Sequence, residues 1–283
     1  MAVIRSTIAY SAAVFHTPTP RGATRPIGPA LQLEDEQNKC ARIVAGAYRS
    51  TPTHLIQTEV GIPPLDLYLN QQAASFLPCQ DYRAKSYQIY HQVFNSTRPI
   101  AGHCRATAYN NPATMHDHIL TGWTEETTLK EWKDRWQRAI TNSRDTPASL
   151  DPAWSGKEIN KRHKELTKAE SSLLIQARTG HIGLNAYLAW REVPRVTPAC
   201  RCGAEAETFD HIVLDCPQVD RTKLPTKVPQ TAAELATALR GTQAARPLLR
   251  WFIQSGRLPE YRLAAEWDET TPNLYNTDTT TPN

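Results

Sequence analysis

Apolar residues recur every three or four positions over several stretches of the chain, which is the spacing of an amphipathic helix. The clearest stretch begins at Thr124, and its apolar face carries Leu129, Trp132, Trp136 and Ile140. Two tryptophans on one face are compatible with a base-stacking platform or with a stripe that packs into the core. We expect the core stripe.

Similar spacing predicts a series of further helices. They cover residues 31–49, a short segment capped by Thr51 or Thr53 that ends before Gly61, and residues 65–76, 82–94, 157–177, 182–190, 231–239 and 246–255. The apolar residues of the first helix fall on or near one face: Leu33, Cys40, Ile43, Val44 and Ala47. Apart from short N-terminal pieces and a cysteine cluster, no segment alternates as a strand does. The pattern therefore predicts a mainly α fold.

Prolines divide these helices into short subdomains. The chain has 21 prolines against 12 glycines, a composition that favours compact helical pieces joined by irregular linkers. The expected parts are a loop with a short strand over 1–30, a helical region over 31–95, a linker over 96–156 that contains the 124–140 helix, and a C-terminal helical region over 157–262. Residues 263–283 are acidic and rich in Thr, Asn and Pro, so we expect a disordered tail.

Charge and hydropathy restrict where the protein acts. The formal net charge is only +4, and no apolar stretch approaches the ~20 residues that cross a bilayer. The first 33 residues contain three arginines and no acid, which is typical of an organelle transit peptide but also fits the start of a truncated segment. We expect an intracellular protein of the nucleus or cytoplasm that is not secreted, so that its six cysteines are reduced.

Three of these cysteines and one histidine have the spacing of a metal site. The candidate ligands are Cys200, Cys202, His211 and Cys216, which form a Cys-x-Cys pair, an eight-residue gap and a His-x4-Cys pair. Gly203 suits the turn, and residues 207–214 are expected to form a helical turn that presents His211. Three thiolates and one imidazole are a full tetrahedral set for a structural Zn2+, with no open position for a catalytic water. The alternative is an accidental cluster.

The remaining cysteines do not indicate a second metal site. Cys104 lies near His103, His116 and His118, but this spacing matches no structural zinc pattern, and we interpret the segment as loop. Cys40 and Cys79 are interpreted as small buried hydrophobic residues.

Basic residues gather before the cysteine cluster and not within it. Between Cys202 and Cys216 there are four acidic residues and no Lys or Arg, so this loop would repel phosphates. The predicted 157–177 helix carries a stripe of lysines opposite its apolar face: Lys157, Lys161, Lys164 and Lys168. We expect these lysines and Arg178 to contact a phosphate backbone. The alternative is an ordinary solvated helix face.

Two blocks of the sequence are distinctive. The first, QNKCARIVAGAYRSTPTHLIQTEVGIPPLDLYLNQ, covers residues 37–71; the second joins SLLIQARTGHIGLNAYL, 172–188, to PACRCGAEAETFDHIVLDCP, 198–217. They resemble the helical region after the polymerase domain, and the C-terminal RTGH stretch with its CCHC zinc knuckle, of fungal LINE-type (non-LTR) retrotransposon reverse transcriptases. With weaker flanks the resemblance covers about half the chain, and residues 1–30 look like the last remnant of the polymerase domain.

The departures from that family concern its catalytic residues. Family members carry an aromatic-x-Asp-Asp motif whose carboxylates hold the metal ions for nucleotidyl transfer, and this sequence has no Asp-Asp pair. Residues 72–171 lack the Asp-Gly-Ser that opens the ribonuclease H domain of many members, and are too few for that domain. The resemblance therefore implies ancestry, and we expect no enzyme activity and no catalytic residues.

These inferences lead to one main hypothesis and two alternatives. The main hypothesis is a catalytically incomplete, reverse-transcriptase-derived protein whose residual role is zinc-dependent binding of RNA or single-stranded DNA. The first alternative is a co-opted, zinc-clipped helical adaptor that binds a protein partner, for which the acidic knuckle loop argues. The second is an active RNA-directed DNA polymerase, against which the missing carboxylates argue. We expect no membrane association and no small-molecule substrate.

Overall fold

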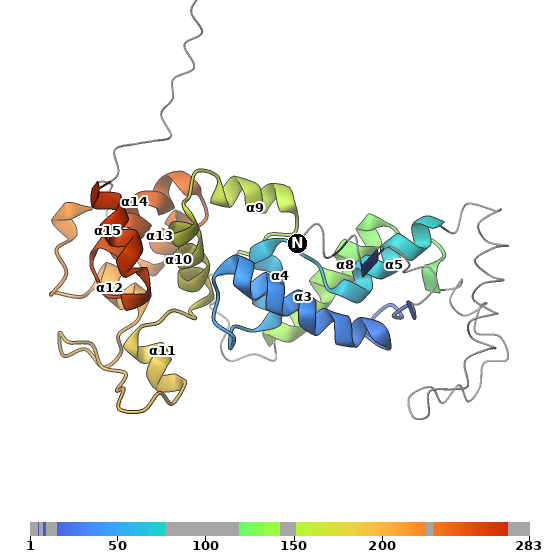
Figure 1. The fold of residues 1–283 in the computed structure, drawn as a ribbon, viewed down its shortest axis with the longest axis horizontal. Helices are drawn as coiled ribbons and strands as arrows, with labels where there is room; N and C mark the ends of the chain where they lie inside the picture. Colours follow the sequence, from blue (N-terminus) through green and yellow to red (C-terminus); the bar gives the residue numbers. More distant parts are fainter. Residues whose placement is uncertain are drawn as a thin grey trace, which may run out of the picture. The chain divides into compact units, whose positions relative to one another are not determined.

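The computed structural model describes Arg5, Ile8, Ala9 and residues 16–76, 119–141, 151–224 and 229–270. Every regular element in these ranges is a helix, which confirms the mainly α prediction (Figure 1). The short strand expected within 1–30 is not found among the described residues there, since Arg5, Ile8 and Ala9 are helical and 16–28 are irregular. The predicted 82–94 helix, Cys79 and the segment around Cys104 lie outside the described residues.

Backbone contacts divide the chain into two compact units. Unit 1 consists of Met1–Ala45, Arg49–Thr146 and Pro152–Ile159, and unit 2 consists of Gly46–Tyr48, Pro147–Asp151 and Asn160–Asn283. Among the described residues, no helix of either unit combines the length and the apolar character that crossing a membrane requires.

The main described helices of unit 1 are α3 (Pro29–Ala45), α4 (Thr53–Val60), α5 (Leu65–Phe76) and α8 (Glu125–Thr141). Helix α3 packs on α4 and α5, and α5 packs on α8. Trp132 of α8 is 3% exposed and packs against Leu67 and Trp123, so the core-stripe prediction is confirmed for this residue. The ring centroids of Trp132 and Trp136 lie 5.1 and 5.4 Å from that of Trp154, edge to face.

The buried face of α3 differs from the one predicted. Ile43 and Val44 are 76% and 52% exposed, and the residues that face the core are Ala30, Glu34, Gln37, Asn38, Ala41 and Ala45. Small alanines let α3 approach its neighbours closely, and the buried polar groups find partners there. Gln57 Nε2 of α4 donates to Glu34 Oε1 at 2.9 Å, and Arg5 Nε donates to Gln37 Oε1 at 2.9 Å.

The ends of α4 confirm one sequence prediction and correct another. The helix ends at Gly61, which has φ +64° in the left-handed region that favours glycine. Neither Thr51 nor Thr53 caps its start, because Pro52 occupies the N-cap position and no side chain there accepts a capping hydrogen bond.

Unit 2 holds a single helical core. Its described helices are α10 (Lys168–Thr179), α11 (Asn185–Trp190), α12 (Phe209–Leu214), α13 (Ala232–Ala238), α14 (Thr242–Gln254) and α15 (Arg262–Thr270), with 3-10 turns at Arg221–Lys223 and Pro259–Tyr261. Helix α14 packs on α10 and α15, and α12 packs on α13. Phe252, Leu248 and Leu249 of α14 are among the fully buried side chains at the centre.

The prediction of one helix over 157–177 is wrong. The segment forms α9 (Gly156–His163) and α10, separated by a turn in which Glu165 has φ +68°. The second helix starts where it does because of a capping box: Thr167 Oγ1 accepts from the Glu170 amide at 3.3 Å, and Glu170 Oε2 accepts from the Thr167 amide at 2.7 Å.

The prediction of a disordered tail from residue 263 is wrong for its first part. Residues 262–270 form α15, and Ala264 and Ala265 pack against the core of unit 2. The packing of these partly buried alanines explains why this segment orders although its composition is polar. Residues 271–283, with most of the Thr/Asn/Pro-rich sequence, lie outside the described residues.

Candidate metal centre

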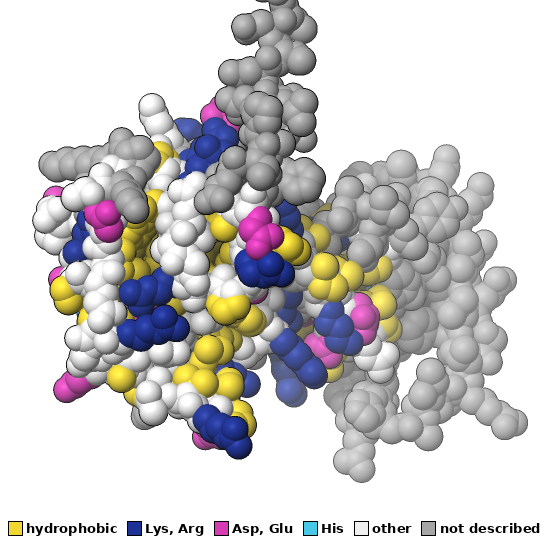
Figure 2. Space-filling model, turned by 60° about the vertical axis from the view of Figure 1, so that its left-hand side comes forward, with side chains coloured by type: hydrophobic (Ala, Val, Ile, Leu, Met, Phe, Trp, Pro, Cys, Tyr) yellow, Lys and Arg dark blue, Asp and Glu magenta, His cyan; other side chains and the backbone are white. Residues whose placement is uncertain are grey.

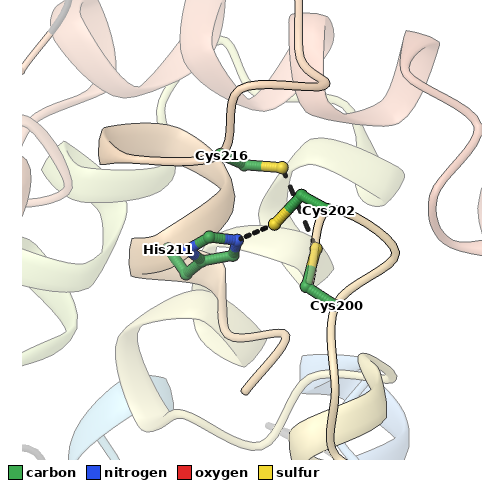
Figure 3. A group of neighbouring side chains, drawn as sticks. All are labelled: Cys200, Cys202, His211 and Cys216. Carbon is green, nitrogen blue, oxygen red and sulfur yellow. Dashed lines mark hydrogen bonds between the residues drawn. The ribbon is translucent and has the colours of Figure 1, made fainter. Parts of the chain in front are cut away.

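Cys200 and Cys202 are held by a tight turn. The Gly203 amide donates to the Cys200 carbonyl at 3.0 Å, and the Cys200 amide donates to the Ala204 carbonyl at 2.9 Å. Gly203 has φ +98°, so a residue without a side chain is required at this point of the turn. The turn directs both thiols to the same side, as the Cys-x-Cys spacing predicted (Figure 3).

Helix α12 presents His211 opposite this turn. It begins because the Thr208 side chain accepts a hydrogen bond from the His211 amide at 3.1 Å, and it is anchored by Ile212 and Val213, which are completely buried. The Cys216 amide donates to the His211 carbonyl at 2.8 Å, which places Cys216 directly after the helix. The predicted helical turn over 207–214 is thus found as α12.

The structure brings the four predicted ligands together. Their ligand atoms all lie within 4.8 Å of one another, and the four side chains point toward one another (Figure 3). The Sγ atoms of Cys200 and Cys216 are 3.8 Å apart, and Cys202 Sγ lies 3.2 Å from His211 Nε2. Two thiolates on a tetrahedral zinc, with Zn–S bonds of about 2.3 Å, lie about 3.8 Å apart. The group could therefore hold one metal ion, and its donor set is that of zinc.

The surroundings shift the pKa values of Cys200 and Cys216 in opposite directions. Burial raises the pKa of Cys200, but hydrogen bonds from the Cys202 backbone and from Cys202, His211 and Cys216 side chains outweigh it and lower the pKa to about 6. Burial, together with the neighbouring thiols, raises the pKa of Cys216. A thiolate at Cys200 near neutral pH is the form that binds metal.

Part of the chain is similar in sequence to a known retrotransposon protein. The chain is 32% identical over 93 residues to the Retrovirus-related Pol polyprotein from type-1 retrotransposable element R1 3 of Nasonia vitripennis. The match covers 32% of this chain and 22% of that polyprotein, so it spans about a fifth of the relative's length. No protein-family model matches the chain, and no solved structure does. The chain thus has a distant, partial similarity to a non-LTR retrotransposon Pol polyprotein.

Arg257 joins the cysteine cluster to the helical core of unit 2. Its guanidinium donates to Glu207 Oε1 at 2.8 Å and lies 3.9 Å from the Sγ atoms of both Cys200 and Cys216. Burial lowers the pKa of Arg257, but the hydrogen bonds to Glu207 and Cys200 outweigh it, so the pKa is raised. Three thiolates and a neutral imidazole around a Zn2+ ion would carry a net charge of about −1, and the Arg257 guanidinium would lie next to this charge.

Glu207 is buried, although an acid in this loop was expected to be exposed. It is one of the four acids of the knuckle loop, yet it is 6% exposed and paired with Arg257. Its Oε2 also accepts from the Asn185 amide at 3.2 Å, which attaches the start of α11 to the knuckle. Three acids of the loop remain exposed, namely Glu205, Asp210 and Asp215.

The residues predicted to bind nucleic acid are only partly available. Arg178 is 6% exposed, and its guanidinium donates to the carbonyls of Leu239 and Asp151 at 3.3 and 2.6 Å, which leaves little of it for a phosphate contact. Lys157, Lys161, Lys164 and Lys168 are exposed. They do not form one stripe, because Lys157 and Lys161 lie on α9, Lys164 in the following turn and Lys168 at the start of α10. Their contact with phosphate stays a prediction.

Arg257 and Glu207 are the residues around the centre that sequence reasoning missed. Arg257 is 41 residues beyond Cys216, and no local spacing links the two. Glu207 follows the turn closely, but an acid in a loop is normally interpreted as exposed.

Proposed function

We propose that this chain is a non-catalytic, zinc-stabilised helical module derived from the C-terminal part of a LINE-type retrotransposon reverse transcriptase, and that it binds RNA or single-stranded DNA. The observation that carries the proposal is the convergence of Cys200, Cys202, His211 and Cys216 within 4.8 Å. The distant similarity to a Pol polyprotein supports nucleic acid as the partner.

The zinc would be structural in this module. Four protein donors complete a tetrahedral shell and leave no position for a reactive water. The ligands come from a turn and from α12, and Glu207 connects the knuckle to α11 and, through Arg257, to the segment after α14. Metal binding would therefore stabilise the arrangement of these segments.

The absence of catalysis is the second part of the proposal. Nucleotidyl transfer requires clustered carboxylates that hold a pair of metal ions, and the sequence contains no Asp-Asp pair. We expect no template-directed primer extension by the purified chain with Mg2+ or Mn2+. Extension above that of a mock purification would contradict this part and favour the polymerase alternative.

A salt titration of binding tests the nucleic-acid part. The affinity of the full chain for a labelled single-stranded oligonucleotide should fall as the salt concentration rises. A plot of log affinity against log salt concentration should be linear, with a slope of about −0.7 per phosphate contact. Cys202→Ser should weaken binding, because it removes a ligand from the knuckle. Cys40→Ser, which removes a thiol outside the cluster, should not. Absence of binding at low salt, or equal binding by Cys202→Ser, would contradict the proposal.

A protein partner is the second candidate, and the exposed acids of the knuckle favour it. Glu205, Asp210 and Asp215 are exposed and lie among the candidate zinc ligands in the sequence, and their negative charges repel phosphate. An adaptor of this kind would bind zinc but show no salt-dependent affinity for RNA or DNA. The titration described above separates the two candidates.

A further inference from the structure

Trp190 is half-exposed at the edge of an aromatic cluster in unit 2. The rings of Tyr48 and Tyr187 are stacked with centroids 5.4 Å apart, and His181 lies edge-on to Tyr187 at 5.4 Å. The Trp190 ring packs beside them, 5.8 Å from Tyr187 and 5.9 Å from His181. Tyr187 and His181 are buried, whereas Trp190 is 50% exposed. The indole thus packs beside buried rings while half of its surface stays exposed.

Three exposed arginines follow Trp190: two precede the candidate zinc ligands, and the third lies between Cys200 and Cys202. They are Arg191, Arg195 and Arg201, and the only acid between Trp190 and Arg201 is Glu192. The Arg191 guanidinium carbon lies 5.3 Å from the Trp190 ring centroid, within the range of a cation–π contact. Figure 2 shows lysine and arginine side chains next to hydrophobic ones on one face of the molecule, including its lower edge.

The backbone fixes this loop at both ends. The Val193 amide donates to the Leu188 carbonyl at 3.0 Å, which ties the loop to α11. The Pro198 carbonyl accepts from the Glu207 amide at 2.7 Å, and this ties it to the knuckle. Arg195 lies between these ties with φ +65°, and Glu192 lies just before the first with φ +57°, a conformation that residues with side chains rarely adopt. Arg191 precedes the loop and Arg201 follows it in the cysteine turn, so the three arginines lie on one constrained segment of the chain.

We propose that Trp190, Arg191, Arg195 and Arg201 form a contact site for single-stranded nucleic acid beside the zinc cluster. This rests on the function proposed above and places its contact surface in the α11–knuckle loop. An exposed indole stacks on an unpaired base of any sequence, and guanidinium groups attract the adjacent phosphates. Bases inside a duplex are already stacked on one another, so an indole gains little from them. The combination of one aromatic face with three cations favours a single strand over a protein partner.

Equilibrium binding of fluorescein-labelled oligo(U) and oligo(dT), about 15 nucleotides long, by the full chain tests this site. Trp190→Ala should weaken binding roughly tenfold, and Trp190→Phe should restore most of it because a stacking ring remains. Replacing Arg191, Arg195 and Arg201 by Gln should flatten the salt slope by about two units. A charge-matched control, Lys39, Lys130 and Lys133 to Gln, removes three exposed cations of unit 1 and should change the slope far less.

Zinc content and helicity of each variant distinguish loss of the site from loss of the fold, and both should equal those of the parent. If the parent binds and the Trp190 and arginine variants bind as well, the assignment of the site is wrong while the proposed function stands. If the parent binds neither oligonucleotide, the contact site and the proposed nucleic-acid binding are both wrong, and the protein-adaptor function is favoured. Equal weakening of duplex and single-strand binding by Trp190→Ala would contradict base stacking.

Discussion

Arg257 makes the least local of the contacts around the cysteine cluster. It approaches two thiol ligands and Glu207 from 41 residues beyond Cys216 in the sequence. The four ligands could be predicted because zinc knuckles place their donors at short, recognisable spacings. The position of the Arg257 guanidinium beside them could not be predicted, since it depends on how the segment after α14 packs.

Removing this charge should weaken metal binding. We expect Arg257→Gln to lower zinc affinity about 10- to 100-fold, as loss of a hydrogen-bonding partner of metal ligands does. Competition against a chromophoric zinc chelator measures the effect. Arg262→Gln is the matched control, because Arg262 is 70% exposed and pairs with Glu266 away from the cluster. Equal affinities of Arg257→Gln and the parent would show that Arg257 does not act on the zinc ligands.

Glu34 should make the stability of unit 1 depend on pH. Burial and the carboxylate of Asp66 raise its pKa from 4.5 to about 7. A carboxyl whose pKa is higher in the folded state keeps its proton to a higher pH there than in the unfolded chain. The free energy of unfolding therefore falls as pH rises from about 4.5 to about 7. Glu34→Gln should therefore stabilise unit 1 near pH 8, by on the order of 2 kcal/mol, and flatten this dependence.

Urea unfolding near pH 5 and pH 8, followed by tryptophan fluorescence, measures this effect, since Trp123, Trp132, Trp136 and Trp154 all belong to unit 1. Glu36→Gln serves as control, because Glu36 is 63% exposed and pairs with Lys39 on the surface. An unchanged pH dependence in Glu34→Gln would refute the role of this carboxyl.

At the scale of elements, the sequence located most helices but not every boundary. The periodic pattern identified α5 and α8 within one or two residues, because their apolar faces are the ones that pack. The break between α9 and α10 was missed, although Thr167 and Glu170 have the spacing of a capping box. The apolar face of α3 was misassigned because its buried side carries alanines and a polar network, which periodicity of large hydrophobic residues cannot detect.

A buried ion pair links α8 to α5. Arg135 donates to both carboxylate oxygens of Asp66 at 2.9 and 2.7 Å, and the two side chains are 8% and 0% exposed. Arg135→Met leaves the carboxylate buried without its cation, so we expect a loss of about 3–5 kcal/mol in the free energy of unfolding.

Urea denaturation tests this prediction. Arg138→Met, on the same helix but with carbonyl partners in place of a buried carboxylate, should cost about 1 kcal/mol or less. Adding Asp66→Leu to Arg135→Met should restore part of the loss, because it removes the uncompensated charge. A loss in Arg135→Met no larger than that of Arg138→Met would argue against the ion pair as the link.

At the scale of the whole molecule, fold class was predictable and the division into units was not. A mainly α chain follows from local periodicity, whereas the units depend on contacts distant in sequence. Gln176 Nε2, for example, donates to the Gly46 carbonyl at 2.9 Å across 130 residues, which assigns a short piece of the N-terminal sequence to unit 2. For the same reason the ligands of the metal centre were predictable and their surroundings, Arg257 and the Trp190 loop, were not.

Native mass spectrometry of the full chain, purified without chelator, measures whether the cysteine cluster binds zinc. We expect one zinc ion per chain, no bound zinc in a Cys202→Ser, Cys216→Ser double variant, and one ion in Cys40→Ser. A parent chain free of zinc, or a double variant that retains it, would show that these four residues are not a zinc site.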